Sequence, residues 1–311
     1  MQNNKLDEFY ERLSDYYSKL EIDNVKKFST ARPITFRVNT LKRKKQEVIN
    51  ELIKEKFKPK NWLYDNTYYL EDVKLKDLKK ASAFKNGDIY LQSFASMLPV
   101  FALAPKAGED ILDVTAAPGS KTSQIASFMG NNGSLVALEL NQLRYERMVH
   151  NLALLGVDTK NFCKTFNIDA NLFLKNSDLK FDKILLDAPC SSSSRICIED
   201  KSTYAKFRPL NFSKFAKVQL QLLQSAFKSL KPNGTLVYST CSIDPAENFE
   251  LIDAFLKSNA DSKLLKITNL EKVESIRPNI NVADDVLKNT LQVMPNKFIE
   301  SFYIALIQKK C

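Results

Sequence analysis

The sequence predicts an α/β fold, in which a mostly parallel sheet carries helices on both faces and follows a small α+β domain. From about residue 85, strand-like and helix-like segments alternate, as is typical of a parallel sheet. Residues 1–84 instead combine two amphipathic helices with two short strands. The 311 residues suffice for one large domain and one small one, each with its own core.

The first domain is expected over residues 1–84. Its predicted elements are a helix, a strand, a second helix and a weaker strand, at 6–20, 34–41, 42–57 and 67–70. Lysine and arginine cluster at 42–45 and again at 54–60 and 74–80, with tyrosines nearby. A charged run is usually a solvated face, but ahead of a catalytic domain it fits contact with RNA equally well. We therefore expect an RNA-binding module here.

The second domain is expected over residues 85–311. Its predicted strands cover 109–114, 134–140, 161–166, 181–188 and 234–241, and the last strands fall within 298–308. Helices are predicted to begin at Ser120, Gln142, Ser213 and Glu247. Ligands of such sheets bind beyond the carboxyl ends of the strands, so motifs at those ends gain weight.

The bulk composition limits the class of protein. The net charge of +10 fits either a lysine-rich composition in general or a polyanionic partner such as nucleic acid. The five cysteines form no CxxC pair and there is a single histidine, so we expect no metal site. The start of the chain is polar, and no apolar run is long enough to span a membrane. We expect a cytoplasmic monomer with reduced thiols.

A turn rich in small residues follows the first strand of the large domain. Asp113 ends that strand, and Lys121 and Thr122 open a helix. Small residues let the backbone approach a ligand, and a helix N-terminus offers unpaired N–H groups. The phosphate-loop and dinucleotide glycine patterns are both absent. The predicted ligand-binding turn consists of Thr115, Ala116, Ala117, Pro118, Gly119, Ser120 and Lys121.

Three acidic residues follow later strands in succession. Glu139 closes the second strand, Asp169 follows the third and Asp187 closes the fourth. A carboxylate in the position of Glu139 can accept hydrogen bonds from both hydroxyls of a ribose. Each acid alone could be a helix cap or a surface charge. Three in a row at strand ends favour a binding site for a nucleoside-containing methyl donor.

Two cysteines lie at strand ends on the same edge of the predicted sheet. Cys190 follows Asp187-Ala188-Pro189, where enzymes that methylate exocyclic amines often carry an aromatic residue, and Cys241 ends the fifth strand. A thiolate that adds to C6 of a pyrimidine turns C5 into a nucleophile, so paired thiols indicate methylation at carbon. The other cysteines, Cys163, Cys197 and Cys311, are interpreted as inert.

With these motifs in place, the sequence resembles the Nop/Sun (RsmB-like) family of RNA 5-methylcytosine methyltransferases. The resemblance covers nearly the whole chain, and its paired PC and TC motifs are highly specific. It implies S-adenosyl-L-methionine as cofactor, a Rossmann-like class I methyltransferase sheet and an RNA-recognition-like N-terminal module. The motifs that carry it are RVNTLK (37–42), GDIYLQSFASMLP (87–99), DVTAAPGSKT (113–122), LLDAPCS (185–191), LKPNGTLVYSTCSIDPAEN (230–248) and FYIAL (302–306).

The resemblance also implies residue roles. Cys241 would be the nucleophile, Cys190 would assist product release, and Asp187 would lie beside the methyl group and the target base. The turn would hold the methionine part of the donor, Glu139 its ribose and Asp169 its adenine. Residue chemistry alone does not order the two thiols, because DNA cytosine methyltransferases use the Pro-Cys thiol. The family usually has glycines where this chain has Ser191 to Ser194, which would narrow the base pocket or stiffen its loop.

Several functions stay open at this point. We expect methylation of a flipped-out cytidine in structured RNA, with small-subunit ribosomal RNA favoured over transfer RNA. A non-catalytic RNA-binding or ribosome-assembly factor on the same scaffold is an alternative that the basic N-terminal residues support. DNA methylation would place the nucleophile at Cys190 and would require a separate target-recognition domain.

Overall fold

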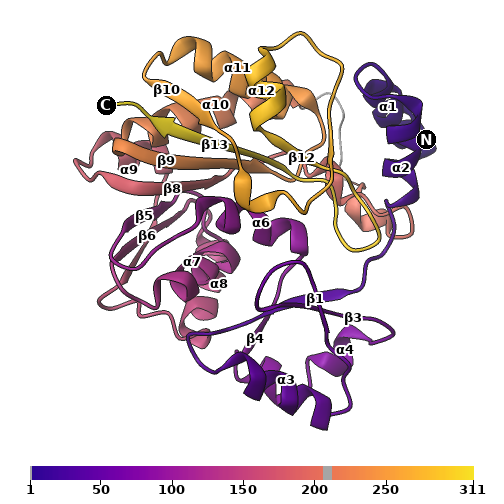
Figure 1. Cartoon of the computed structure of the whole chain (residues 1–311), viewed down its shortest axis with the longest axis vertical. Coiled ribbons are helices and arrows are strands. Elements are labelled where there is room, and N and C mark those ends of the chain that lie inside the picture. The colour runs from indigo at the N-terminus through magenta and orange to yellow at the C-terminus, as the bar shows by residue number, and fades with distance from the viewer. Residues whose placement is uncertain (1, 206–211) are drawn as a thin grey trace.

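The computed structural model describes residues 2–205 and 212–311 and contains two sheets (Figure 1). A nine-stranded sheet forms the centre of the larger part, and a four-stranded sheet lies below it in the view of Figure 1. Within the described residues, no helix is both long and apolar enough to cross a lipid bilayer.

The nine-stranded sheet is mostly parallel, as predicted. Its order is β11-β12-β13-β9-β8-β5-β6-β7, and β10 pairs with β13. The strands β5 to β9 run parallel to one another, whereas β13 is antiparallel to β9. The strands are β5 (Asp110–Asp113), β6 (Ser134–Glu139), β7 (Cys163–Asn167), β8 (Phe181–Asp187), β9 (Leu230–Thr240), β10 (Ser262–Leu265), β11 (Ser275–Ile276), β12 (Leu291–Val293) and β13 (Tyr303–Lys309).

Helices cover both faces of this sheet, and each face has its own core. Successive strand residues point to opposite faces, so Ile111 belongs to one apolar cluster and Leu112 to the other. The first cluster includes α6 (Phe94–Leu103), α7 (Ser120–Met129) and α8 (Gln142–Leu154). The second includes α9 (Ala170–Lys175), α10 (Phe212–Lys228), α11 (Phe249–Ser258) and α12 (Asp284–Asn289). The short 3-10 helices are η1 (Ser193–Arg195), η2 (Lys201–Thr203), η4 (Pro245–Glu247) and η5 (Thr268–Leu270).

The small sheet is antiparallel and has the order β2-β3-β1-β4. Its last strand lies beyond residue 84, so this sheet continues past the point where we divided the chain. The predicted division into 1–84 and 85–311 otherwise stays a prediction. The elements of this part are β1 (Ile34–Val38), α3 (Lys45–Lys54), β2 (Lys60–Asn61), β3 (Thr67–Leu70), α4 (Leu75–Leu78), α5 (Ser82–Lys85) and β4 (Ile89–Leu91).

The chain begins with two helices where one was predicted. These are α1 (Gln2–Ser14) and α2 (Lys19–Lys27). The break occurs because Ser18 adopts an extended backbone and forms a reciprocal capping box with Glu21. Both helices contribute to one apolar cluster with residues of the larger part, including Ile243 and Ile276, rather than packing on the small sheet.

Two buried polar residues of the RVN segment join the small sheet to the large domain. Arg37, which is 3% exposed, donates hydrogen bonds to the Ser123 hydroxyl at 2.6 Å and to the Ser120 carbonyl at 3.2 Å in α7. Asn39 donates to the carbonyls of Gly87 and Leu155, both at 2.8 Å. Buried polar groups without partners are costly, so these contacts fix the small sheet against the start of α7 and the end of α8.

Candidate active site

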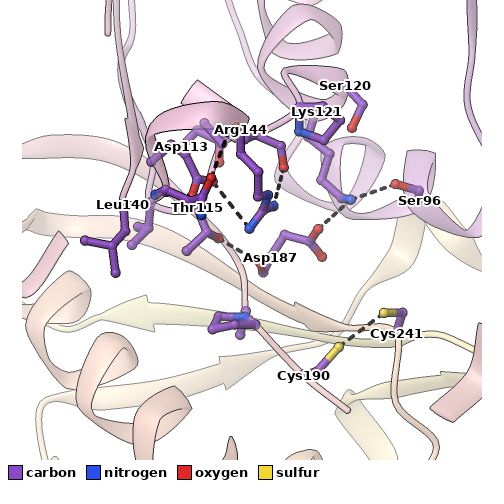
Figure 2. A pocket seen from close by; sticks show the side chains of 18 of the residues that line it. Ser96, Asp113, Thr115, Ser120, Lys121, Leu140, Arg144, Asp187, Cys190 and Cys241 are labelled. Carbon is purple, nitrogen blue, oxygen red and sulfur yellow. Dashed lines mark hydrogen bonds and ion pairs between the residues drawn. The ribbon is translucent and has the colours of Figure 1, made fainter. Parts of the chain in front are cut away.

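A cavity of about 960 Å³ opens at the carboxyl ends of the central strands (Figure 2). Parallel strands deliver their ends to one edge, which is why motifs far apart in sequence meet here. Of the predicted site residues, only Gly119 does not line it. Those that do are Thr115, Ala116, Ala117, Pro118, Ser120, Lys121, Glu139, Asp169, Asp187, Cys190 and Cys241.

The turn between β5 and α7 has the form that a close ligand requires. Gly119 precedes the first residue of α7 with φ of +92°, a conformation that favours glycine. A Cβ atom there would already touch Met148 and Leu152 of α8 at 3.4 Å. The Arg144 guanidinium donates to the Ala117 carbonyl at 2.8 Å and so ties α8 to the turn.

Glu139 and Asp169, the two acidic residues predicted to bind the ribose and adenine of the methyl donor, differ in their hydrogen-bond partners. Glu139 is 5% exposed, and its carboxylate accepts a hydrogen bond from the Asn141 backbone N–H at 2.8 Å. Arg144 lies 3.6 Å from the same carboxylate. Asp169 caps α9, since one of its oxygens accepts from the N–H of Asn171 at 2.7 Å. Asp169 is therefore a helix cap as well as a cavity residue.

Asp113 is a cavity residue that the sequence argument left out of the site. Its carboxyl is fully buried, and burial raises its pKa to about 7. Oδ2 accepts from the Thr122 hydroxyl at 2.7 Å, whereas Oδ1 has no hydrogen-bond partner among the described residues. An unpartnered buried acceptor beside the predicted ligand-binding turn suits a ligand with N–H or O–H groups. Its place at the end of β5 was the signal available in the sequence.

Asp187 and Lys121 form an ion pair on the side of the cavity nearer the thiols (Figure 2). The Lys121 ammonium lies 2.7 Å from Asp187 Oδ2 and 2.7 Å from the Ser96 hydroxyl. The Ser239 hydroxyl donates to the second oxygen of Asp187 at 2.9 Å. Lys121 also lies over the ring of Phe302, 5.5 Å from its centroid. Lys121 was predicted to bind a ligand as part of the turn, but its ammonium extends to Asp187.

The two cysteines of the motifs are neighbours, as predicted. Cys190 Sγ and Cys241 Sγ are 3.2 Å apart and both thiols are free. The hydrogen bond with Cys190 lowers the pKa of Cys241, and a second hydrogen bond, between Cys241 and the Ser192 hydroxyl, acts in the same direction. The same contact and burial raise the pKa of Cys190. The contact between the two sulfurs therefore shifts their pKa values in opposite directions.

Glu247 holds both cysteine loops, although its role was not evident from the sequence. Its carboxylate accepts from the Ser191 backbone N–H at 3.0 Å, the Gln219 amide at 2.8 Å and the Ser242 hydroxyl at 2.7 Å. Ser191 and Ser242 directly follow Cys190 and Cys241. Burial raises the pKa of Glu247, while these three hydrogen bonds oppose that shift. Glu247 thus positions the thiols without lining the cavity itself.

Three serines of the run after Cys190 contact the loop that carries Cys241. The hydroxyls of Ser191 and Ser193 lie 3.2 Å and 3.1 Å from the Ser242 hydroxyl. Ser192 has φ of +58°, a conformation in which glycine is commoner, and its hydroxyl lies 3.4 Å from Cys241 Sγ. The serine side chains therefore connect the loop of Cys190 to the loop of Cys241.

The basic run at 42–45 has partners within the chain. Arg43 pairs with Glu51 and with Asp88, the latter at 3.3 Å. Lys45 pairs with Asp65 at 2.5 Å, and Lys42 donates to two backbone carbonyls. Intramolecular pairing satisfies most of this run, so it is a weaker candidate for RNA contact than its charge alone indicated.

Comparisons with known proteins show similarity to RNA methyltransferases. A family model described as 16S rRNA methyltransferase RsmB/F matches residues 100–308. A tRNA (cytosine(49)-C(5))-methyltransferase of Pyrococcus abyssi is 35% identical over 99% of this chain and 96% of that protein. The chain belongs to the RsmB/F family of methyltransferases. The predicted family and enzyme class, RNA cytosine-C5 methyltransferase, are confirmed.

Relatives named for ribosomal RNA are longer. The ribosomal RNA small subunit methyltransferase F of Serratia proteamaculans is 33% identical over 88% of this chain, but the chain spans 56% of its length. A methyltransferase homolog from Pyrococcus horikoshii has a solved structure that is 33% identical, with a TM-score of 0.78 over 94% of this chain and 95% of that one. A structure of NSun6 from the same species, with a TM-score of 0.81 and 24% identity, supports the fold alone.

Proposed function

We propose that the protein methylates C5 of cytidine in structured RNA through a covalent adduct between Cys241 and C6 of the base. The observation that carries this proposal is the thiol pair, with sulfurs 3.2 Å apart, in the same cavity as the donor turn and its acids. A non-catalytic scaffold has no need of two free thiols held next to each other beside this cavity.

The cavity suits S-adenosyl-L-methionine, which supplies an electrophilic methyl group when bound. Its ribose hydroxyls are donors that match the carboxylate of Glu139, and its ammonium matches the unpartnered oxygen of Asp113. The turn around Ala116 and Ala117 leaves room for the backbone to contact the methionine portion. Asp169 has one oxygen outside its capping bonds and is assigned to the adenine.

The chemistry of the base follows from the residues on the thiol side. Cys241 attacks C6 as a thiolate, and a C–S bond forms while electron density moves to C5, the atom that takes the methyl group. Asp187 accepts a hydrogen bond from the exocyclic amine, which selects cytidine over uridine. Lys121, held 2.7 Å from Asp187, is assigned to the electron-rich edge of the ring after attack.

Breakdown of the adduct requires loss of the C5 proton and departure of Cys241. Cys190 remains protonated during the attack because burial and the neighbouring sulfur raise its pKa. We assign it to this second stage, in which the proton of its thiol first passes to solvent water and its thiolate then accepts the proton from C5. The electrons of the C5–H bond then expel the sulfur of Cys241 as a thiolate, which restores the starting state.

The RNA substrate is proposed from the relatives. The relative named for tRNA cytosine 49 is matched over 96% of its length, so nearly all of that enzyme has a counterpart here. The relative named for ribosomal RNA is matched over 56% of its length. We therefore place transfer RNA first and keep small-subunit ribosomal RNA, which the sequence analysis favoured, as the second candidate.

Purified protein provides a direct test. With S-adenosyl-L-methionine and RNA that carries 5-tritiated cytidine, tritium should be released to water as methyl groups are incorporated. Bisulfite sequencing of total RNA, with and without the gene, should then identify the methylated cytidine. Protein that binds RNA and donor but releases no tritium from either transfer or ribosomal RNA would support the non-catalytic alternative.

A further inference from the structure

A second cavity, of about 390 Å³, opens directly beside the first. The two share five lining residues, namely Leu91, Gln92, Ser93, Arg195 and Glu300. Its remaining walls come from both parts of the chain. The small sheet contributes the segment that leads into β1, and the loop before β13 contributes Phe298. A chain-like ligand in one cavity can therefore pass across these shared residues into the other.

Glu300 is the most unusual of the shared residues. It is only 7% exposed, and no hydrogen bond or ion pair of its carboxylate occurs among the described residues. An ionised carboxylate accepts hydrogen bonds and donates none, and the oxygens of Glu300 are not among the fully buried atoms without a partner, so a ligand in the cavities can reach them. Its position at the junction of two cavities means that a bound ligand can provide the missing donor.

Two arginines flank Glu300. Arg32 donates to the Phe28 carbonyl at 2.7 Å, but its Nε is buried and has no partner among the described residues. Burial lowers the pKa of Arg32, and the negative charge of Glu300 opposes that shift. Arg195 is exposed, lines both cavities and has no carboxylate partner in the described structure. Arg195, unlike Arg43 and Lys45, is therefore free to meet phosphate.

We propose that the second cavity binds the nucleotide next to the target cytidine, with a ribose 2′-hydroxyl donating to Glu300 and the connecting phosphate bound by Arg195. This proposal rests on the function proposed above. If the target base occupies the first cavity and its neighbour the second, the sugar–phosphate link must cross the shared residues. A 2′-hydroxyl is the donor that every RNA nucleotide carries there, whatever its base. Ile34 and Phe298 give the neighbouring base an apolar wall.

The proposal is tested by a double-mutant cycle, in which a 2′-deoxy substitution in the RNA is combined with a substitution of Glu300 in the protein. An RNA hairpin whose target cytidine is unmethylated is prepared with a single 2′-deoxy nucleotide on the 5′ side or the 3′ side of that cytidine, and kcat/KM for its methylation is measured. For wild-type protein, one of these two substitutions should lower kcat/KM by about tenfold or more, since a hydrogen bond to a charged acceptor is lost. A 2′-deoxy nucleotide several positions away serves as the control and should have no effect.

Protein variants then identify the acceptor. Glu300→Ala should methylate the all-ribose and 2′-deoxy hairpins with equal kcat/KM, because the hydrogen bond is already absent. Glu300→Gln keeps an acceptor oxygen and should retain part of the discrimination. The exposed Glu271→Ala is the matched control and should discriminate as wild type does.

Other outcomes would contradict the proposed nucleotide subsite in the second cavity. Wild-type protein indifferent to both flanking 2′-deoxy substitutions would exclude the ribose contact, even if no Glu300 variant folds. An undiminished effect in Glu300→Ala would place the contact elsewhere. Loss of kcat/KM only when the neighbouring base lacks an exocyclic amine would mean that Glu300 reads a base. An all-ribose hairpin that is never methylated would instead contradict the proposed function itself.

Discussion

Replacing Cys190 should make Cys241 harder to ionise. The sulfurs of Cys190 and Cys241 are 3.2 Å apart, and this contact, in which we assign Cys190 as the donor, is the largest cause of the lowered pKa of Cys241. A hydrogen bond to a charged group contributes about 1.5–3 kcal/mol. Since one pKa unit corresponds to about 1.4 kcal/mol, Cys190→Ala should raise the pKa of Cys241 by about one to two units.

Alkylation of Cys241 by iodoacetamide at a series of pH values measures this shift, because only the thiolate reacts. Mass spectrometry of the Cys241 peptide separates its rate from those of the other cysteines. The midpoint of the rate profile should move to higher pH in Cys190→Ala. Cys190→Ser retains a hydroxyl donor and should move it less. A midpoint that stays in place or moves to lower pH in Cys190→Ala would refute the assigned direction of the hydrogen bond.

Three further predictions concern the donor site and the loops around it. Glu139→Ala should weaken S-adenosyl-L-methionine binding by about tenfold to a hundredfold, and calorimetry giving an unchanged Kd would place the ribose elsewhere. Burial raises the pKa of Asp113 from 3.8 to about 7, so the folded protein binds the extra proton and loses stability as pH rises between those values. Asp113→Asn should therefore be more stable than wild type by up to about 4 kcal/mol at pH 8 and by less than half of that at pH 5, and equal urea midpoints at pH 8 would contradict this. Arg12→Ala should leave the fully buried carboxylate of Asp244 unpaired and lower the free energy of unfolding by about 2 kcal/mol, whereas an unchanged urea midpoint would show that the pair contributes nothing.

The parallel sheet and the line of candidate site residues at its edge were predictable from the sequence. The apolar strands alternate with amphipathic helices, and the strand ends carry Glu139, Asp187, Cys190 and Cys241. Parallel topology alone requires such ends to meet at one edge, so no knowledge of side-chain packing was needed.

Contacts that depend on long-range packing were not predictable. Apolar spacing continues across Ser18, so a capping box was mistaken for helix interior. Glu247 was visible in the motif, but its partners come from two other segments of the chain. Lys121 was assigned to the donor turn, because nothing in the sequence indicates that its ammonium reaches Asp187. The charge run at 42–45 was likewise read without its carboxylate partners.

The order of the two thiols is tested most directly by trapping the RNA adduct. Each variant is incubated with donor and substrate RNA and run on a denaturing gel, where a covalent complex migrates as a larger, nuclease-sensitive species. Cys190→Ala should accumulate this species, because Cys241 can still attack while breakdown is impaired. Cys241→Ala and the double variant should form none. Accumulation in Cys241→Ala but not in Cys190→Ala would contradict the assignment and make Cys190 the nucleophile.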